Sequence, residues 1–161
     1  MKYDIILAGV GGQGVLSVSA IIASAAMKEG LQVKQSEVHG MSQRGGSVLA
    51  NLRLADAPIA SDLIPIGGAA MILSMEPLES LRYLRYLSPD GALVTSTNPV
   101  VNIPDYPELN GLLAVVRSLP FARLVDGETL EHFIRTTFAA KGGKIVETNL
   151  KAFRAGREAA E

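Results

Sequence analysis

The sequence contains neither cysteine nor tryptophan among its 161 residues, and aromatic residues make up only 5% of it. Without cysteine the chain can form no disulfide, no thiolate metal site, no cysteine nucleophile and no thiolate-ligated iron–sulfur cluster. Because aromatic side chains are so few, we expect a core built from Ala, Val, Ile and Leu.

The sequence also lacks an excess of charge of either sign. It has 15 basic and 16 acidic residues and a formal net charge of −1, whereas proteins that wrap nucleic acid usually carry a basic field. Its apolar runs are shorter than the ~20 residues of a membrane-spanning helix, and residues 1–5 do not begin a signal peptide. We therefore expect a cytoplasmic protein that binds neither nucleic acid nor a membrane.

Residues 3–38 predict a strand, a helix and a second strand. The apolar run Tyr3–Ala8 is too short for a helix, residues 15–29 carry apolar side chains at spacings of three to four, and Val33–Val38 is again typical of a strand. Gly30 is expected to end the helix. Such a strand–helix–strand unit has parallel strands and a right-handed crossover.

The rest of the chain continues this alternation. Residues 47–54 alternate apolar and polar side chains, which predicts a strand with one polar face, and antiparallel pairing is open to it. Further along we expect a strand at 70–74, a helix at 78–87 after Pro77, a turn at 88–91, a strand at 92–96, a loop at 98–107, a strand or helix at 112–116, the end of a last strand at 124–125, and helices at 128–140 and 147–161.

The order of these segments predicts the fold class. It is α/β, with a doubly wound, mostly parallel open sheet and helices on both faces. The content of 48% hydrophobic and 19% charged residues is ordinary for a globular protein. The length suits one domain, so residues 1–161 are expected to form a single unit.

A first glycine loop joins the first predicted strand to the first predicted helix with the spacing G-x-G-x-x-G. Its members are Gly9, Gly11, Gly12, Gln13 and Gly14. Glycine permits positive φ angles and close approach of a ligand, and the helix N-terminus that follows favours an anion; Gln13 is expected to bond the backbone of the turn. The motif alone leaves two alternatives open, a nicotinamide or flavin site with Glu37 on the ribose, or a tight turn without a ligand.

A second glycine segment, residues 40–46, follows the second predicted strand and is dense in polar side chains. With the end of that strand it supplies Glu37, His39, Ser42, Gln43, Arg44, Gly45 and Gly46. Because both glycine stretches follow strands of one unit, we expect both at the carboxyl edge of the sheet, where open α/β folds bind ligands. Arg44 suits an anion or an interface salt bridge, since guanidinium pairs bidentately with carboxylate or phosphate.

Four stretches of the sequence together resemble a known family. They are residues 9–14, 36–46, 71–79 and 149–156. They are similar to the γ subunit, or γ domain, of the 2-oxoacid:ferredoxin oxidoreductases, and most similar in wording to the small subunit of the indolepyruvate enzymes. The chain departs from the family after residues 124–127, which lead almost directly to the closing helices where family members carry a further helical stretch.

The resemblance implies a subunit of an oxidoreductase complex that oxidatively decarboxylates a 2-oxoacid to an acyl-CoA and reduces ferredoxin. Thiamine diphosphate, iron–sulfur clusters and coenzyme A are then expected in the complex, with thiamine-binding and ferredoxin-like subunits as partners. This chain alone is expected to bind none of these cofactors and no metal, and to be inactive in isolation.

The resemblance also implies roles for both glycine stretches. No catalytic residue is expected on this chain alone, but the wall of a shared active site would be formed by Glu37, His39 and Arg44. Contacts with coenzyme A or with partner chains would be made by Gly9, Gly11, Gly12, Gln13, Gly14, Ser42, Gln43 and Arg44. Two alternatives stay open, a free-standing Rossmann-like nucleotide-binding protein and a scaffold whose glycine stretches make only protein contacts.

Overall fold

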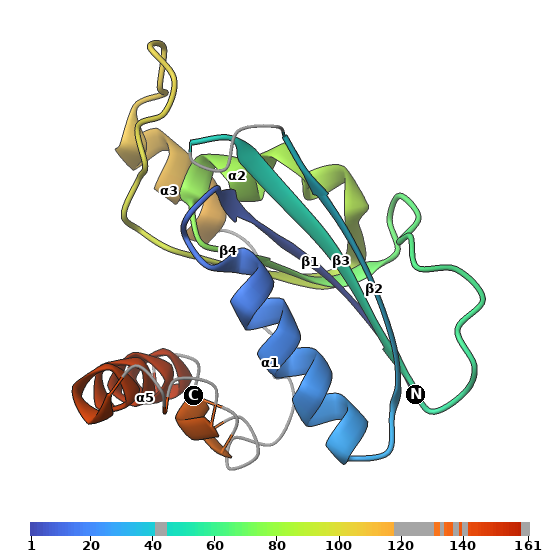
Figure 1. The fold of residues 1–161 in the computed structure, drawn as a ribbon. Helices are drawn as coiled ribbons and strands as arrows, with labels where there is room; N and C mark the ends of the chain where they lie inside the picture. Colours follow the sequence, from blue (N-terminus) through green and yellow to red (C-terminus); the bar gives the residue numbers. More distant parts are fainter. Residues whose placement is uncertain (41–44, 118–130, 133, 137–138, 140–141, 159–161) are drawn as a thin grey trace.

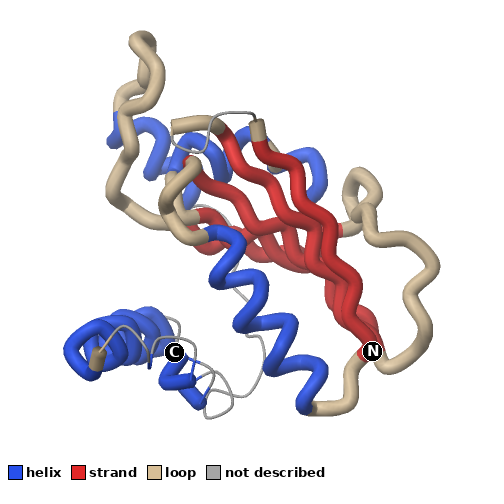
Figure 2. Tube along the Cα trace, in the orientation of Figure 1, coloured by secondary structure: helices blue, strands red, loops and turns tan. Residues whose placement is uncertain are grey.

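An open sheet of five strands forms the centre of the structure (Figures 1 and 2). The computed structural model describes residues 1–40, 45–117, 131–132, 134–136, 139 and 142–158. Its strands are β1 (Lys2–Val10), β2 (Gln32–His39), β3 (Ser47–Ala55), β4 (Ala69–Ser74) and β5 (Leu87–Thr95). Its helices include α1 (Val15–Lys28), α2 (Pro77–Arg82), α3 (Leu109–Arg117) and α5 (Gly143–Glu158), and a 3₁₀ turn, η1 (Leu84–Tyr86), follows α2.

The strands lie in the order β2-β3-β1-β4-β5. β3 pairs antiparallel with both β1 and β2, whereas β4 pairs parallel with β1 and β5. Strands β1, β2, β4 and β5 therefore run in one direction and β3 runs against them. The predicted strand–helix–strand unit has parallel strands as expected, but β3 lies between them, and the antiparallel option for residues 47–54 is confirmed.

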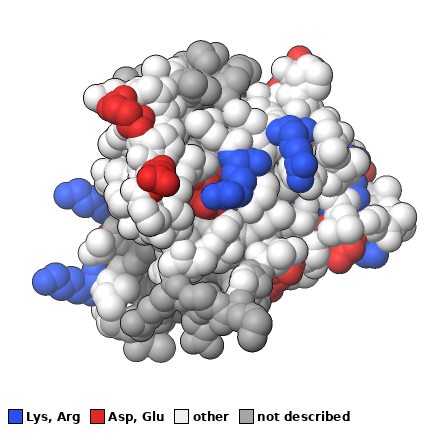
Figure 3. Space-filling model, turned by 90° about the horizontal axis from the view of Figure 1, so that it is seen from above, with Lys and Arg blue, Asp and Glu red and all other residues white. Residues whose placement is uncertain are grey.

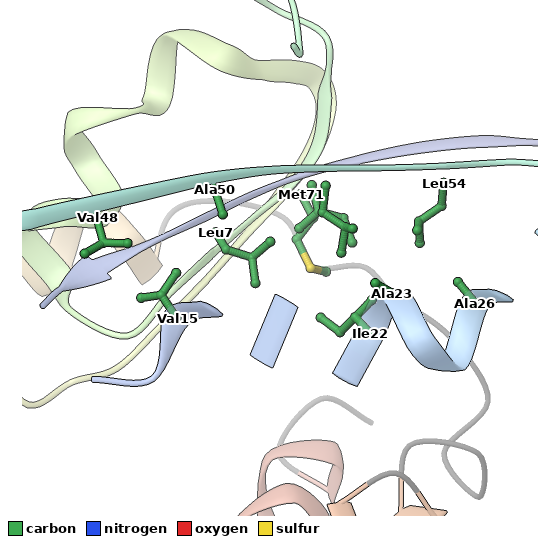
Figure 4. Packing of buried hydrophobic residues seen from close by; sticks show 11 residues of the cluster. Leu7, Val15, Ile22, Ala23, Ala26, Val48, Ala50, Leu54 and Met71 are labelled. Carbon is green, nitrogen blue, oxygen red and sulfur yellow. The ribbon is translucent and has the colours of Figure 1, made fainter. Parts of the chain in front are cut away.

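Helix α1 covers one face of the sheet with an aliphatic layer (Figure 4). The buried residues of this layer are Ile5, Leu7, Val15, Ile22, Ala23, Ala26, Val48, Ala50, Leu52, Leu54 and Met71. The small side chains of Ala23 and Ala26 allow the helix to lie close to the strands. The helix begins after Gly14 and ends before Gly30, whose φ of 84° is left-handed, as predicted.

Helix α2 and the turn η1 cover the opposite face. The buried residues there are Ile6, Ile64, Ala69, Ile72 and Leu93, with Leu81, Tyr83 and Leu84 packed against them. Pro77 occupies the first helical turn as predicted. The fold class is confirmed, because an open α/β sheet carries helices on both faces (Figure 2).

The polar face predicted for β3 is buried rather than exposed to solvent. Arg53 forms two parallel hydrogen bonds with Asp4, both at 2.9 Å. Its Nη1 atom donates to the carbonyl oxygens of Ser61 and Leu63, also at 2.9 Å. These bonds hold the loop between β3 and β4 against strand β3. The loop therefore covers the polar side chains of the strand.

Two predictions for the segment between α2 and β5 are wrong. The helix expected at 78–87 ends at Arg82, since η1 follows it and Leu87 already belongs to β5. The turn expected at 88–91 lies inside β5 as an irregularity, because Ala69 pairs with Leu87 whereas Met71 pairs with Ala92. The residues that favour a turn here produce a bulge in the strand and no chain reversal.

The C-terminal helix packs on the outer side of α1. Val146 and Leu150 of α5 are buried together with Ile21 of α1 and Ile134. Helix α5 starts at Gly143, four residues before the predicted start, and the ambiguous segment 112–116 lies in α3.

Parts of the C-terminal prediction cannot be compared with the structure. The strand end expected at 124–125, the departure from the family at 124–127, and parts of the helices expected at 128–140 and 147–161 lie outside the described residues. No described helix has both the length and the apolar character needed to cross a membrane.

Candidate functional site

The two glycine stretches meet at the carboxyl edge of the sheet, as the topology predicts. The Gly11 N–H donates to the Gly46 carbonyl oxygen at 2.7 Å, and the Gly45 N–H donates to the Gly11 carbonyl oxygen at 3.4 Å. The first loop follows β1 and the second segment leads into β3. Segments more than 30 residues apart in the chain thus form one backbone surface.

Gln13 holds the first glycine loop in shape. Its side-chain Oε1 accepts the Val10 N–H at 2.8 Å, and its Nε2 donates to the Met75 carbonyl oxygen at 3.0 Å. The interpretation that Gln13 bonds backbone is therefore confirmed. Because Met75 lies between β4 and α2, the amide connects the first loop to the neighbouring strand–helix joint.

The glycines of the first loop serve different physical needs. Gly12 and Gly14 have φ angles of 100° and 82°, a region that L side chains rarely adopt. Gly9 is required by packing, since a Cβ there would lie 2.8 Å from Val15 Cγ2 and 3.2 Å from Met75 Cβ. Gly9 is buried, whereas Gly12 and Gly14 are exposed.

Helix α1 starts directly behind this loop. Its N-cap, Gly14, makes no side-chain capping bond, and no acidic residue lies in the first turn. The first backbone N–H groups of a helix lack intrahelical partners and carry the positive end of the helix dipole. This end of the edge is therefore suited to an anion or to carbonyl groups of another chain.

The other predicted site residues lie at different distances from the carboxyl edge of the sheet. His39 ends β2 and lies in one cross-strand row with Val48 and Gly9. Two strand spacings separate His39 from Gly9 along this row, roughly 10 Å. Glu37 is exposed and pairs with Ala50, two residue pairs further from this end of the sheet than His39. Ser42, Gln43 and Arg44 lie outside the described residues.

A buried carboxylate beside the glycine surface was missed by the sequence predictions. Glu76 is only 1% exposed. Its Oε2 accepts the Glu79 N–H at 2.8 Å and so caps α2, while its Oε1 accepts the Val100 N–H at 3.3 Å and the Tyr106 hydroxyl. A Glu directly before a first-turn proline is the signal that could have identified this cap.

A second buried carboxylate connects α2 to the start of β3. Glu79 Oε2 accepts the Ser47 hydroxyl at 2.6 Å, and both Glu79 oxygens accept Arg82, at 3.1 and 3.2 Å. The Ser47 hydroxyl also lies 3.1 Å from the Tyr83 hydroxyl. Since Ser47 directly follows the second glycine segment, this network fixes that segment against α2.

The pKa of Tyr106 is affected by its contact with the buried Glu76 side chain. Burial is the largest cause that raises the pKa of the Tyr106 phenol well above its ordinary value, and the hydrogen bond to the Glu76 carboxylate adds to it. The phenol therefore stays protonated and acts as a hydrogen-bond donor to Glu76. It ties the loop after β5 to α2.

The surface above the sheet carries scattered charges of both signs among wide uncharged areas (Figure 3). No group of three or more His, Cys, Asp or Glu residues within the described part of the chain could hold a metal ion. What the described residues offer here is exposed glycine backbone, a helix N-terminus and a rigid polar support beneath them. Such an edge suits binding and positioning of another molecule.

Comparisons with known proteins agree with this geometry. A sequence model of the family described as pyruvate ferredoxin/flavodoxin oxidoreductase matches residues 4–122. The chain is 36% identical over 156 residues to indolepyruvate oxidoreductase subunit IorB of Archaeoglobus fulgidus, covering 93% of this chain and 73% of that subunit.

Two solved structures are similar in fold. One is the 2-oxoglutarate:ferredoxin oxidoreductase of Magnetococcus marinus, solved with 2-oxoglutarate, coenzyme A and succinyl-CoA bound. Its TM-score is 0.74 at 19% identity, and the match covers 99% of this chain but 31% of that chain. The other is the keto/oxoacid ferredoxin oxidoreductase gamma subunit of Geobacter sulfurreducens, with a TM-score of 0.62 at 23% identity and 98% of each chain covered.

Proposed function

The chain belongs to the pyruvate ferredoxin/flavodoxin oxidoreductase family, and we propose on this premise that it is the small, non-autonomous subunit of a 2-oxoacid:ferredoxin oxidoreductase. We propose indolepyruvate as the 2-oxoacid, because the chain is 36% identical to a subunit of an indolepyruvate oxidoreductase. The proposal treats residues 1–161 as one α/β domain of a cytoplasmic complex with thiamine-binding and ferredoxin-like subunits.

The proposed reaction needs groups that this chain does not supply. A 2-oxoacid loses carbon dioxide, its acyl group passes to coenzyme A, and two electrons pass to ferredoxin. Thiamine diphosphate supplies the carbanion chemistry of such a reaction, and iron–sulfur clusters carry the electrons. Since the sequence has no cysteine, the usual thiolate ligands of the clusters must come from the partner subunits.

The single observation that carries the proposal is the joined glycine surface. Two separate glycine stretches are bonded to each other through Gly11, while Gly12 and Gly14 remain exposed at the N-terminus of α1. Exposed backbone N–H groups at a helix N-terminus can bind a phosphate of coenzyme A or the backbone of a partner chain. Gly9 and Gln13 contribute by keeping the loop in this shape.

Ser42, Gln43 and Arg44, which belong to the second glycine segment, contact coenzyme A or the partner. Arg44 also forms the wall of the shared active site, together with Glu37 and His39. These roles are part of the proposal and rest on the matching motif positions.

The strand order favours this function over an ordinary dinucleotide site. In the Rossmann arrangement the second strand lies beside the first, so its terminal acid reaches the ribose of a nucleotide on the first loop. Here β3 lies between β2 and β1, so Glu37 is one strand further from the first glycine loop than in the Rossmann arrangement. Calorimetric titration of the isolated chain with NAD and with FAD separates the two functions, because measurable binding heat would support the nucleotide site.

The proposal is tested with the assembled complex. We expect the isolated chain to show no turnover, and the complex with its thiamine-binding partner to oxidise 2-oxoacids only when coenzyme A is present. Among indolepyruvate, 2-oxoglutarate and pyruvate, indolepyruvate should give the highest kcat/KM. Activity that is independent of coenzyme A would contradict the acyl-transfer role, and a preference for another 2-oxoacid would contradict the substrate.

A further inference from the structure

The loop that connects β5 to α3 protrudes from the glycine end of the molecule. Residues 98–107, called here the 98–107 loop, are drawn in yellow beside α3 in Figure 1. Two of its side chains are large, apolar and open to solvent: Val101 is 69% exposed and Ile103 is 38% exposed. Asp105 is its single charged residue.

Both ends of the loop are fixed to the same buried carboxylate. Near its start the Val100 N–H donates to Glu76 Oε1 at 3.3 Å, and near its end the Tyr106 hydroxyl donates to the same oxygen. Glu76 is 1% exposed and also caps α2. The base of the loop is therefore held to the folded core.

The tip of the loop is bonded to the second glycine segment. Asn102 Nδ2 donates to the Gly45 carbonyl oxygen at 3.0 Å. Asn102 stands between Val101 and Ile103 in the chain, so the backbone of both residues lies near the glycine surface. The loop and the glycine surface are thus parts of one continuous edge.

The composition of the loop suits a protein interface. Interface cores are depleted of charged residues, and the loop carries apolar side chains and amides with one acid. Three prolines, Pro99, Pro104 and Pro107, restrict its backbone. A loop that is already ordered loses less conformational entropy when it binds a partner.

We propose that the 98–107 loop is a docking element for the thiamine diphosphate-binding partner subunit, with Val101 and Ile103 as its apolar contacts and Glu76 as the residue that positions it. The inference rests on the proposed function, which brings the adjoining glycine surface against coenzyme A or a partner chain of the complex. The partner is expected to present an apolar depression beside the site where it meets the glycine surface.

The test compares the affinities of variants of this chain for the purified thiamine diphosphate-binding subunit of the complex. The variant Val101→Ser/Ile103→Ser should raise the Kd about tenfold or more, as expected when buried apolar contacts are lost. The matched control is Ile66→Ser, which is also 69% exposed but lies in the loop between β3 and β4, at the opposite end of the sheet. Its Kd should equal that of the wild type.

A second variant tests the positioning role of the buried carboxylate. Tyr106→Phe keeps the ring and removes the hydroxyl donor to Glu76, so the Kd should rise by about three- to tenfold, the equivalent of one hydrogen bond. The unfolding midpoint of every variant is measured first. Should the double variant be unfolded, the milder Ile103→Ala replaces it.

The outcomes separate this inference from the proposed function. If the wild-type chain does not bind the thiamine diphosphate-binding subunit, the proposed function itself is wrong. If the wild type binds and the double variant binds with the same Kd, the docking role is overturned while the proposed function stands. Loss of self-association with an unchanged Kd for the subunit would assign the loop to a second copy of this chain and also overturn the inference.

Discussion

Replacing Gly9 with alanine tests whether close packing shapes the first glycine loop. The new Cβ would lie 2.8 Å from Val15 Cγ2, 3.0 Å from Gln13 Oε1 and 3.2 Å from Met75 Cβ. Val15 is 3% exposed and stands in the first turn of α1, so it has little room to move. Overpacking of this kind costs about 1–3 kcal/mol.

The expected effect is measurable by thermal unfolding. A loss of about 2 kcal/mol lowers the Tm of a chain of this length by about 4–8 °C. The matched control is Gly143→Ala at the start of α5, where a Cβ would meet no atom within 4 Å and φ is not left-handed. That variant should keep the Tm of the wild type or raise it slightly, since alanine favours helix over glycine.

A double variant identifies the cause. Gly9→Ala/Val15→Ala removes the methyl group that the new Cβ would meet, so it should be less destabilised than the sum of the single variants by about 0.5–3 kcal/mol. Gly12→Ala, which suffers from its φ of 100° and not from a neighbour, should show no such coupling with Val15→Ala. Additive effects of Gly9→Ala and Val15→Ala would refute the packing argument.

Three further changes probe the supports of the site. Arg53→Met leaves the buried Asp4 carboxylate without its main partner, so the free energy of unfolding in urea should fall by about 3–5 kcal/mol. Gln13→Leu removes the amide that joins the first loop to the strand–helix joint, which should cost about 1–3 kcal/mol in the same assay. The pKa of the Tyr106 phenol is raised in the folded state, so the unfolded state loses the phenol proton first as the pH rises. The contribution of the protonated phenol to the stability of the fold is therefore full below about pH 10 and is lost as the pH rises further. Tyr106→Phe should therefore lose less stability than the wild type between about pH 8 and pH 11, and an equal loss would show that the phenol is not the group responsible.

The contact between the two glycine stretches could be predicted because it depends on local pattern and strand direction. The apolar run before Gly9 and the helical spacing after Gly14 define a strand, a tight turn and a helix. Parallel strands end at one edge, so a second glycine segment after β2 had to lie near the first. The hydrogen bonds of Gly11 with Gly45 and Gly46 confirm that prediction.

The strand order and the buried polar groups could not be predicted in this way. No local feature states that β3 lies between β1 and β2, because pairing depends on the whole sheet. Asn51 and Arg53 alternate with apolar residues as an exposed face does, yet the loop that follows β3 folds back and covers them. The role of Glu76 was hidden for the same reason, since its partner Tyr106 is 30 residues away.

The central claim is that this chain completes an active site which its partner cannot form alone. It is tested most directly by titrating the purified chain into the thiamine diphosphate-binding and ferredoxin-like subunits and following coenzyme A-dependent reduction of ferredoxin by indolepyruvate. The rate should be negligible without the chain and should rise with added chain until it saturates. Full activity of the partner subunits without this chain would show that it does not complete the active site.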